Sequence, residues 1–182
     1  MSKKPETMSK RVEALHEAEA KARLGGGEAR LAKQHEQGKM SARERLDALL
    51  DPNSFEEVGL FRRNRTTTFG MDTADMPADG VITGCGTVLG RPVRVASQDF
   101  TVAGGSAGET HNKKVVAMMQ SALENGTPFM FFNDSGGARV QEGIDSLSGY
   151  GQVFYANVLL SGVVPQISII AGPCAGGAVY SP

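Results

Sequence analysis

Three glycine-rich loops contain the residues of this chain whose types and spacing could do chemistry. They hold Gly104–Gly105, Gly136–Gly137–Ala138 and Gly176–Gly177–Ala178, and each follows a short apolar run that predicts a buried strand. Consecutive glycines let the backbone take positive φ and approach a ligand closely. Free N–H groups at the start of a helix favour negative charge. The pattern therefore indicates sites for a phosphate or a developing oxyanion, or else tight turns in an α/β core.

The reactive side chains of the sequence exclude several other kinds of site. Cys85 and Cys174 are far apart with no CxxC, which argues against a disulfide framework. His16, His35 and His111 form no HExxH or paired spacing, so no metal site is predicted. A serine protease needs a histidine base beside a serine, and His111 alone, upstream of both Gly-Gly-Ala loops, makes that interpretation weak.

Composition and charge favour a globular domain with an uneven surface. The 182 residues suit one domain, and 40% are hydrophobic. The formal net charge is −1, so nothing indicates nucleic-acid binding. Residues 1–65 carry 14 Lys and Arg against 11 Asp and Glu, an excess that could meet a phosphate but is typical of a solvated face.

The last 37 residues, 146–182, contain no charged side chain. Gly162, Pro165, Gly172 and Pro173 interrupt this stretch, which excludes a membrane-spanning helix. We expect a deeply buried strand–helix layer instead, covered by another part of the molecule or by a partner.

The hydrophobic periodicity predicts the elements that position the loops. Ser41 and Glu44 form a capping box that opens a helix, residues 1–7 are expected to be disordered, and residues 61–80 an irregular surface loop. The turn of a β-hairpin is expected at Gly90–Pro92. Expected helices are 8–24, 28–37, 43–50, 109–124 and 145–161, and expected strands are 55–60, 81–89, 93–97, 129–134 and 167–171.

Two helices show an apolar face. The helix 109–124 places Val115, Met119 and Ala122 on one side, and the helix 145–161 places Leu147, Gly151, Phe154 and Val158 on one side. The chain begins with helices, continues with a β meander and ends with repeated strand–loop–helix units. This order predicts an α/β domain whose later strands are parallel. The glycine loops then lie at the carboxyl edge of the sheet, where such sheets bind ligands.

Four long motifs in order carry a resemblance to a known family. The segments are Lys39–Leu46, Ser97–Ser106, Asp134–Gly143 and Ala175–Pro182. They closely resemble the carboxyltransferase (beta) subunit of biotin-dependent acyl-CoA carboxylases, and the propionyl-CoA carboxylase and methylmalonyl-CoA carboxyltransferase branch is the most similar. The resemblance covers the chain from about Lys10 to Pro182.

The resemblance implies a crotonase-like (ββα superhelix) α/β fold, incomplete, with an N-terminal helical extension. Residues 1–52 would form that helical segment, and residues 53–182 the first part of a truncated N-terminal crotonase-like domain. The second domain of the family would be absent. On this interpretation the chain is a fragment that is inactive alone.

The resemblance also implies the chemistry. Family members transfer a carboxyl group between carboxybiotin, on a separate mobile carrier, and the α-carbon of a short acyl-CoA, with propionyl-CoA favoured. Backbone N–H groups hold the thioester oxygen while it carries negative charge. The catalytic positions carried over are Gly177 and Ala178 (the oxyanion-hole peptide) with Gly137 and Ala138 (the neighbouring loop), and the ligand-binding positions are Gly104, Gly105, Gly136 and Gly176.

Partners are implied in the same way: acyl-CoA, biotin carboxyl carrier and biotin carboxylase subunits, and a hexamer of the full-length parent. A cytoplasmic location is expected, or the mitochondrial matrix in a eukaryote, although no transit peptide is seen. Two alternatives stay open, a biotin-dependent acyl-CoA decarboxylase subunit and a non-catalytic truncated or scaffold copy.

Overall fold

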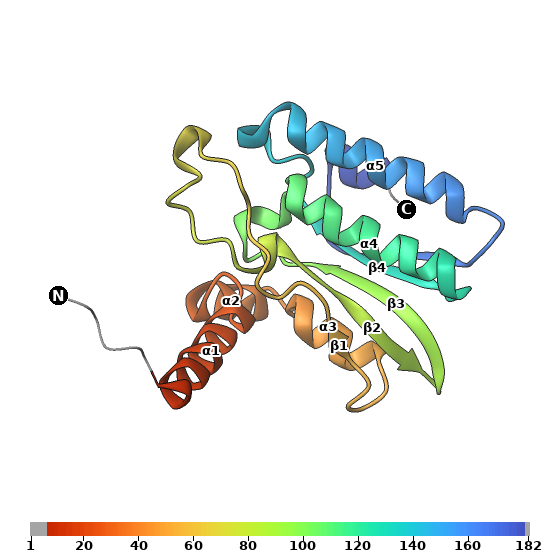
Figure 1. The fold of residues 1–182 in the computed structure, drawn as a ribbon. Coiled ribbons are helices and arrows are strands. Elements are labelled where there is room, and N and C mark those ends of the chain that lie inside the picture. Colours follow the sequence, from red (N-terminus) through yellow and green to blue (C-terminus); the bar gives the residue numbers. More distant parts are fainter. Residues whose placement is uncertain (1–6, 181–182) are drawn as a thin grey trace.

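A computed structural model describes residues 7–180 (Figure 1). The predicted disorder of residues 1–7 therefore lies, except for Thr7, outside the described residues. The helices are α1 (Met8–Arg23), α2 (Glu28–Glu36), α3 (Ala42–Leu49), α4 (Glu109–Asn125) and α5 (Ile144–Leu160). The strands are β1 (Glu56–Glu57), β2 (Val81–Val88), β3 (Arg91–Gln98), β4 (Phe129–Ser135) and β5 (Gln166–Cys174).

The strands form one sheet in the order β1-β2-β3-β4-β5. β1, β2 and β3 pair antiparallel, whereas β3, β4 and β5 pair parallel, which confirms the predicted meander followed by parallel strands. The hairpin turn lies at Leu89–Gly90, both at positive φ, rather than at Gly90–Pro92. Pro92 pairs with Thr87 within the strands, because the Asp51 carboxylate accepts the N–H groups of Leu89 and Gly90 and fixes a two-residue turn.

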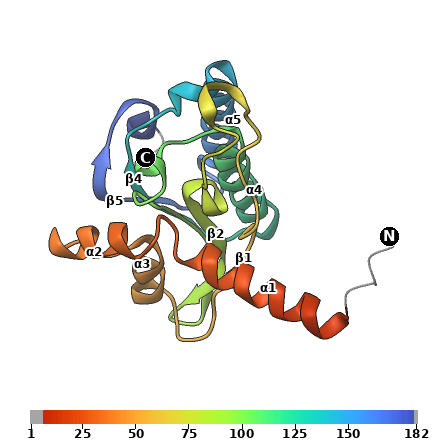
Figure 2. The ribbon, with the colours of Figure 1, turned by 90° about the vertical axis from the view of Figure 1, so that its left-hand side faces the viewer.

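Helices cover both faces of the sheet. Figure 1 shows α4 and α5 side by side on one face and α3 on the other. The α4/α5 layer encloses a core that contains Val115, Met119 and Phe131. On the opposite face, Leu46 and Val95 belong to a second core beneath α3. Figure 2 shows α1 extending away from the sheet, which agrees with its largely exposed side chains.

The buried face of α4 is the predicted one, but that of α5 is not. Leu147 and Val158 of α5 are 58% and 71% exposed. The helix instead buries the face that carries Tyr150, Val153 and Leu160. A close contact with α4 sets this rotation, because a Cβ on Gly149 would lie 2.6 Å from the Asn112 side chain.

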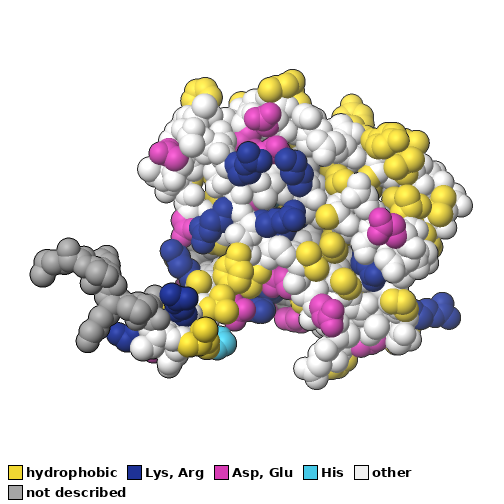
Figure 3. All heavy atoms as spheres, viewed as in Figure 1, with side chains coloured by type: hydrophobic (Ala, Val, Ile, Leu, Met, Phe, Trp, Pro, Cys, Tyr) yellow, Lys and Arg dark blue, Asp and Glu magenta, His cyan; other side chains and the backbone are white. Residues whose placement is uncertain are grey.

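The uncharged stretch is only partly buried, so residues 7–180 do not themselves supply the expected cover. Most residues of β5 are exposed or half-buried because it is an edge strand. Exposed apolar side chains include Tyr155, Val163, Ile167 and Ile170. Figure 3 shows hydrophobic side chains gathered on the right of the molecule, where α5 ends in Figure 1. Among the described residues, no helix is long and apolar enough to cross a membrane.

Candidate functional site

The three glycine loops meet at the carboxyl ends of β3, β4 and β5. We call them loop 1 (residues 102–106), loop 2 (residues 135–139) and loop 3 (residues 174–178). The N–H of Gly136 donates to the carbonyl of Gly104 at 3.0 Å, which joins loops 1 and 2. The N–H of Ala175 donates to the carbonyl of Ser135 at 3.1 Å, which joins loops 2 and 3. Parallel strands thus join loops through residues 32 and 40 positions apart in the sequence, as the topology predicts.

Two glycines are required by this close approach. A Cβ on Gly105 would lie 2.1 Å from the carbonyl oxygen of Asp134. A Cβ on Gly137, whose φ is +98°, would lie 2.7 Å from the carbonyl oxygen of Ala175. Packing of loop against loop therefore explains part of the glycine pattern without any ligand.

Loop 2 does not open directly into a helix. A short turn at Val140–Glu142 and then Gly143 separate it from α5. The N–H groups of Gly136, Gly137 and Ala138 consequently lie outside the first turn of a helix. Any anion held there is held by individual peptide groups rather than by a helix dipole.

Several N–H groups of the predicted oxyanion loops already have acceptors. The N–H of Gly137 donates to Ser135 Oγ at 3.0 Å, and that of Ala178 donates to the carbonyl of Ala175 at 3.2 Å. For the N–H groups of Ala138 and Gly177, no acceptor is found among residues 7–180. Loop 2 therefore offers the Ala138 N–H to a ligand. Loop 3 offers the Gly177 N–H and also the Gly176 N–H, for which no acceptor is found among residues 7–180 either.

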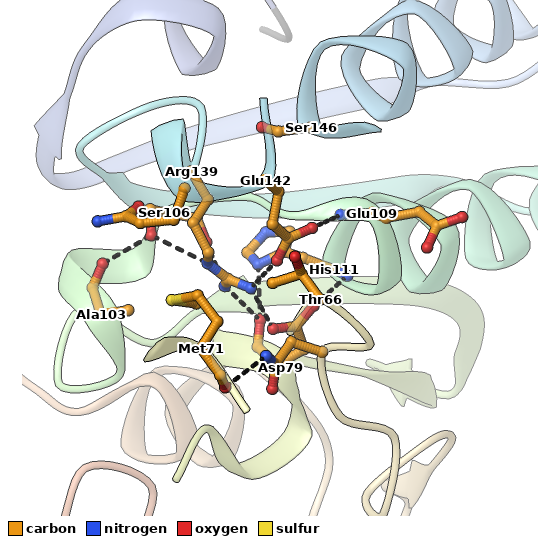
Figure 4. Close-up of polar contacts among 12 residues, drawn as sticks. Thr66, Met71, Asp79, Ala103, Ser106, Glu109, His111, Arg139, Glu142 and Ser146 are labelled. Atoms are coloured by element: carbon orange, nitrogen blue, oxygen red, sulfur yellow. Dashed lines mark hydrogen bonds and ion pairs between the residues drawn. The ribbon is translucent and has the colours of Figure 1, made fainter. Parts of the chain in front are cut away.

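A buried arginine lies where loop 2 ends (Figure 4). Arg139 is 1% exposed. It pairs with the carboxylate of Asp79, with that of Glu142 at 2.8 Å, and with the carbonyl of Ser106 in loop 1 at 2.7 Å. Arg139 thus ties loop 1 to loop 2 through charge-assisted hydrogen bonds.

The two carboxylates beside Arg139 also cap α4. Glu142 accepts the N–H of Glu109 at 2.7 Å, and Asp79 accepts the N–H of His111 at 2.7 Å. These N–H groups belong to the first turn, which has no acceptor within the helix. Burial raises the pKa of the Asp79 carboxyl, and the Arg139 charge opposes that rise. One ion cluster therefore fixes loop 1, loop 2 and the start of α4.

Two further basic groups are buried nearby. Burial, reinforced by the Arg139 charge, lowers the pKa of His111 to about 3, so the imidazole is neutral. The His111 ring contacts Gln98 Nε2 and the Asp79 carbonyl. Burial lowers the pKa of Lys114 to about 8, and its ammonium donates to the carbonyls of Ala78 and Val81. Neither group reaches the glycine loops through these contacts.

A second buried ion pair anchors the end of β4. Arg45 of α3 donates to Asp134 Oδ2 at 2.5 Å, and the two side chains are 3% and 0% exposed. Sequence reasoning included Arg45, Asp134 and Arg139 in motifs but assigned them no role. For Asp134 and Arg139, the signal that could have found them is a charged side chain within two residues of a glycine loop. Arg45 lies among other charged residues and carries no such signal.

The side chains next to loop 3 are poor proton acceptors at neutral pH. Burial raises the pKa of Tyr150 to about 12. Burial, and then the negative charge of Asp134, raises the pKa of the Cys174 thiol. The Tyr150 ring lies directly against Gly177, where a Cβ would approach it to 2.8 Å. Residues 7–180 contain no cluster of three or more His, Cys, Asp or Glu that could hold a metal ion.

One cavity adjoins loop 1, and a second lies beside Phe100 and Thr101, directly before that loop. One, of about 360 Å³, is lined by Arg30, Ala103, Ser106 and other residues. The other, of about 330 Å³, is lined by Arg30, Lys33 and Phe100 among others. Arg30 borders both, and its side chain donates to the carbonyl of Thr101 at 3.0 Å. Arg30 of α2 therefore lies beside loop 1, and Lys33 of α2 lies beside Phe100 and Thr101, which lead into that loop.

Residues 33–182 match the model of the carboxyl transferase domain family, and the chain belongs to that family. It is 70% identical over 176 residues to the methylmalonyl-CoA carboxyltransferase 12S subunit of Propionibacterium freudenreichii subsp. shermanii, which covers 97% of this chain and 34% of that protein. It is 58% identical over 171 residues to the propionyl-CoA carboxylase beta chain of Roseobacter denitrificans, which covers 94% and 34% respectively. The chain spans about a third of the length of these relatives.

Solved structures confirm the crotonase-like α/β fold. The crystal structure of transcarboxylase 12S, a hexamer assembly with methylmalonyl-coenzyme A bound, superposes with a TM-score of 0.95 at 69% identity, over 98% of this chain and 35% of that one. A Pseudomonas malonate decarboxylase hetero-tetramer in complex with malonate gives 0.70 at 29% identity, over 78% and 55%.

Proposed function

We propose that this chain provides the acyl-CoA side of a biotin-dependent carboxyltransferase. The reaction moves a carboxyl group between carboxybiotin, on a separate carrier, and the α-carbon of a short acyl-CoA, with propionyl-CoA favoured. The observation that carries the proposal is the pair of N–H groups, Ala138 on loop 2 and Gly177 on loop 3, that lack an acceptor among residues 7–180. Donors on adjacent loops suit a single oxygen between them.

These donors would act on the thioester carbonyl. Transfer of the α-proton to a base that arrives with the carrier would move negative charge onto that oxygen, and the enolate would then form the new carbon–carbon bond to the carboxyl carbon. N–H groups held rigid before the reaction stabilise this charge, and one such donor is typically worth about 10²–10³ in rate. The ion cluster around Arg139 supplies this rigidity, because the buried carboxylates of Asp79 and Glu142 hold Arg139 at the end of loop 2.

The side chains at the loops include no evident base, which supports the proposal that the reactive group is brought by a separate carrier. Tyr150 and Cys174 have raised pKa values, so neither is a base near pH 7. When bound, carboxybiotin supplies the carboxyl group. The chain itself binds and orients the thioester and provides the oxyanion donors.

The cavities beside loop 1 suit the nucleotide end of the acyl-CoA. Arg30 and Lys33 line them, and their cations complement phosphate groups. Asp75 also lines the larger cavity, but it pairs with Lys21 and Arg63, so its charge is compensated. Loop 1 would then lead from the phosphates to the thioester.

The direction of transfer and the partners belong to the same proposal. The chain is also 54% identical over 176 residues to the methylmalonyl-CoA decarboxylase subunit alpha of Veillonella parvula, so a decarboxylase subunit is the second candidate. A biotin carrier, a biotin carboxylase and a hexameric parent are the partners we infer. The exposed apolar side chains of α5 and β5 support assembly with a further protein surface.

Titration calorimetry of the folded chain with propionyl-CoA tests the proposal, after circular dichroism has established that the chain is folded. We expect saturable binding that Gly177→Val weakens at least tenfold, because a side chain there collides with the Tyr150 ring. Gly151→Ala is the matched control, since a Cβ there meets nothing within 4 Å. A folded chain that binds no propionyl-CoA, or binding that Gly177→Val leaves unchanged, contradicts the proposal.

A further inference from the structure

We infer that Ser135 is the positioning residue of the thioester site, an inference that rests on the proposed function. Ser135 is the last residue of β4 and is fully buried. Its hydroxyl donates to the carbonyl of Gly105 in loop 1 at 2.7 Å and accepts the N–H of Gly137 in loop 2 at 3.0 Å. Its carbonyl accepts the N–H of Ala175 in loop 3 at 3.1 Å. One residue thus hydrogen-bonds to all three loops.

The hydroxyl is suited to this role because it donates one hydrogen bond and accepts others at the same oxygen. Its bond to the Gly137 N–H fixes the Gly136–Gly137 peptide. The next peptide carries the Ala138 N–H, and its carbonyl accepts the N–H of Ala107 at 2.9 Å, so the Ser135 bond and the Ala107 bond together aim the Ala138 N–H. Its bond to Gly105 fixes loop 1 against the same point. Alanine at position 135 would leave the Gly137 N–H and the Gly105 carbonyl without this partner inside the protein.

Ser135 is not placed to act as a nucleophile. Its proton is committed to the Gly105 carbonyl. The only histidine beyond residue 35 is His111, whose ring contacts Gln98 and Asp79 rather than Ser135. A nucleophilic serine needs a base within hydrogen-bond reach, so the geometry assigns Ser135 a positioning role.

Ser97 offers a matched control. It lies on β3 and is as buried as Ser135. Its hydroxyl has no hydrogen-bond partner among the described residues. Ser97→Ala therefore removes a buried serine hydroxyl without removing a link between loops.

The test compares propionyl-CoA with its thioether S-propyl-CoA, which lacks the carbonyl oxygen. We expect the wild-type chain to bind the thioester about tenfold more tightly. Ser135→Ala should reduce this preference about threefold to tenfold and leave binding of the thioether unchanged. Ser135→Cys, close in size but a weak hydrogen-bond partner, should fall between, and Ser97→Ala should match wild type. A merely structural role would change the binding of both ligands equally.

A ligand-free measurement keeps the two proposals separable. Amide hydrogen exchange at Gly137 should become at least tenfold faster in Ser135→Ala or Ser135→Cys and stay unchanged in Ser97→Ala. A thioester preference that survives Ser135→Ala overturns the inference and leaves the proposed function intact. A wild-type chain without thioester preference overturns both. If Ser135→Ala does not fold, Ser135→Cys is used in its place. A preference for the thioester as large as that of the wild type in Ser135→Cys then overturns the inference.

Discussion

Loops 2 and 3 both contain Gly-Gly-Ala, yet the protein holds them by different means. Loop 2 lies between two buried ion pairs, Arg139 with its carboxylates on one side and Arg45–Asp134 on the other. Loop 3 follows an edge strand, and its described contacts are backbone hydrogen bonds, a bond from Cys174 Sγ to the carbonyl of Ala178 at 3.3 Å, and the ring of Tyr150. The same local sequence is therefore rigid for different reasons in the two places.

The two loops also differ in whether their surroundings are complete within this chain. Buried ion pairs are costly to break because they leave an unpaired charge in the interior, so loop 2 is fixed within this chain. Loop 3 lies beside exposed apolar residues such as Ile170 and Val179. We expect another protein surface to cover them.

Arg139→Met gives the largest expected effect and tests the anchoring of loop 2. The change leaves the carboxylates of Asp79 and Glu142 buried without their cation, so the free energy of unfolding should fall by about 3–5 kcal/mol. Urea unfolding followed by circular dichroism measures it. Arg91→Met, at an exposed position of β3, should change stability by less than about 0.5 kcal/mol. A loss below about 1 kcal/mol for Arg139→Met would show that the cluster does not anchor the loop.

Lowering the pH should reduce the stability of the folded chain, because His111 is buried as a neutral imidazole. Its pKa is about 3 in the folded chain against an ordinary 6.5, so between these pH values the unfolded chain binds a proton that the folded chain does not. Stability should therefore fall as the pH falls below 6.5, by up to about 1.4 kcal/mol per unit. His111→Gln should flatten this dependence between pH 6.5 and 5, whereas His16→Gln, at an exposed site, should retain it. Equal slopes for wild type and His111→Gln would refute a buried neutral imidazole.

The smallest effect on stability is expected for a change on the exposed face of α5. Val158→Gln on the exposed face of α5 should change the free energy of unfolding by less than about 0.5 kcal/mol. Val153→Ala on the buried face should cost about 2 kcal/mol. Both values come from thermal or urea unfolding. A large loss for Val158→Gln would mean that this face is already packed in the free chain.

Local patterns in the amino-acid order were enough to predict most elements and the glycine loops. The capping box at Ser41 and Glu44 forms as expected, and α4 ends at Asn125, one residue past the predicted helix 109–124. These features depend on neighbours in the chain, so they are readable from short stretches. The motifs likewise identified the family, because long strings of particular residues at loop ends are specific.

Only the tertiary structure decided how those elements face each other. The buried side of α5 was predicted wrongly because periodicity reports an apolar stripe but not which neighbour it meets, and Gly149 against Asn112 set the rotation. The lack of charge in residues 146–182 could not show how far this chain buries them by itself, because burial depends on what covers a surface and not on its composition. Ser135 and Arg139 gained their roles in the same way: each contacts partners 30 or more positions away, at distances that only the packed sheet produces.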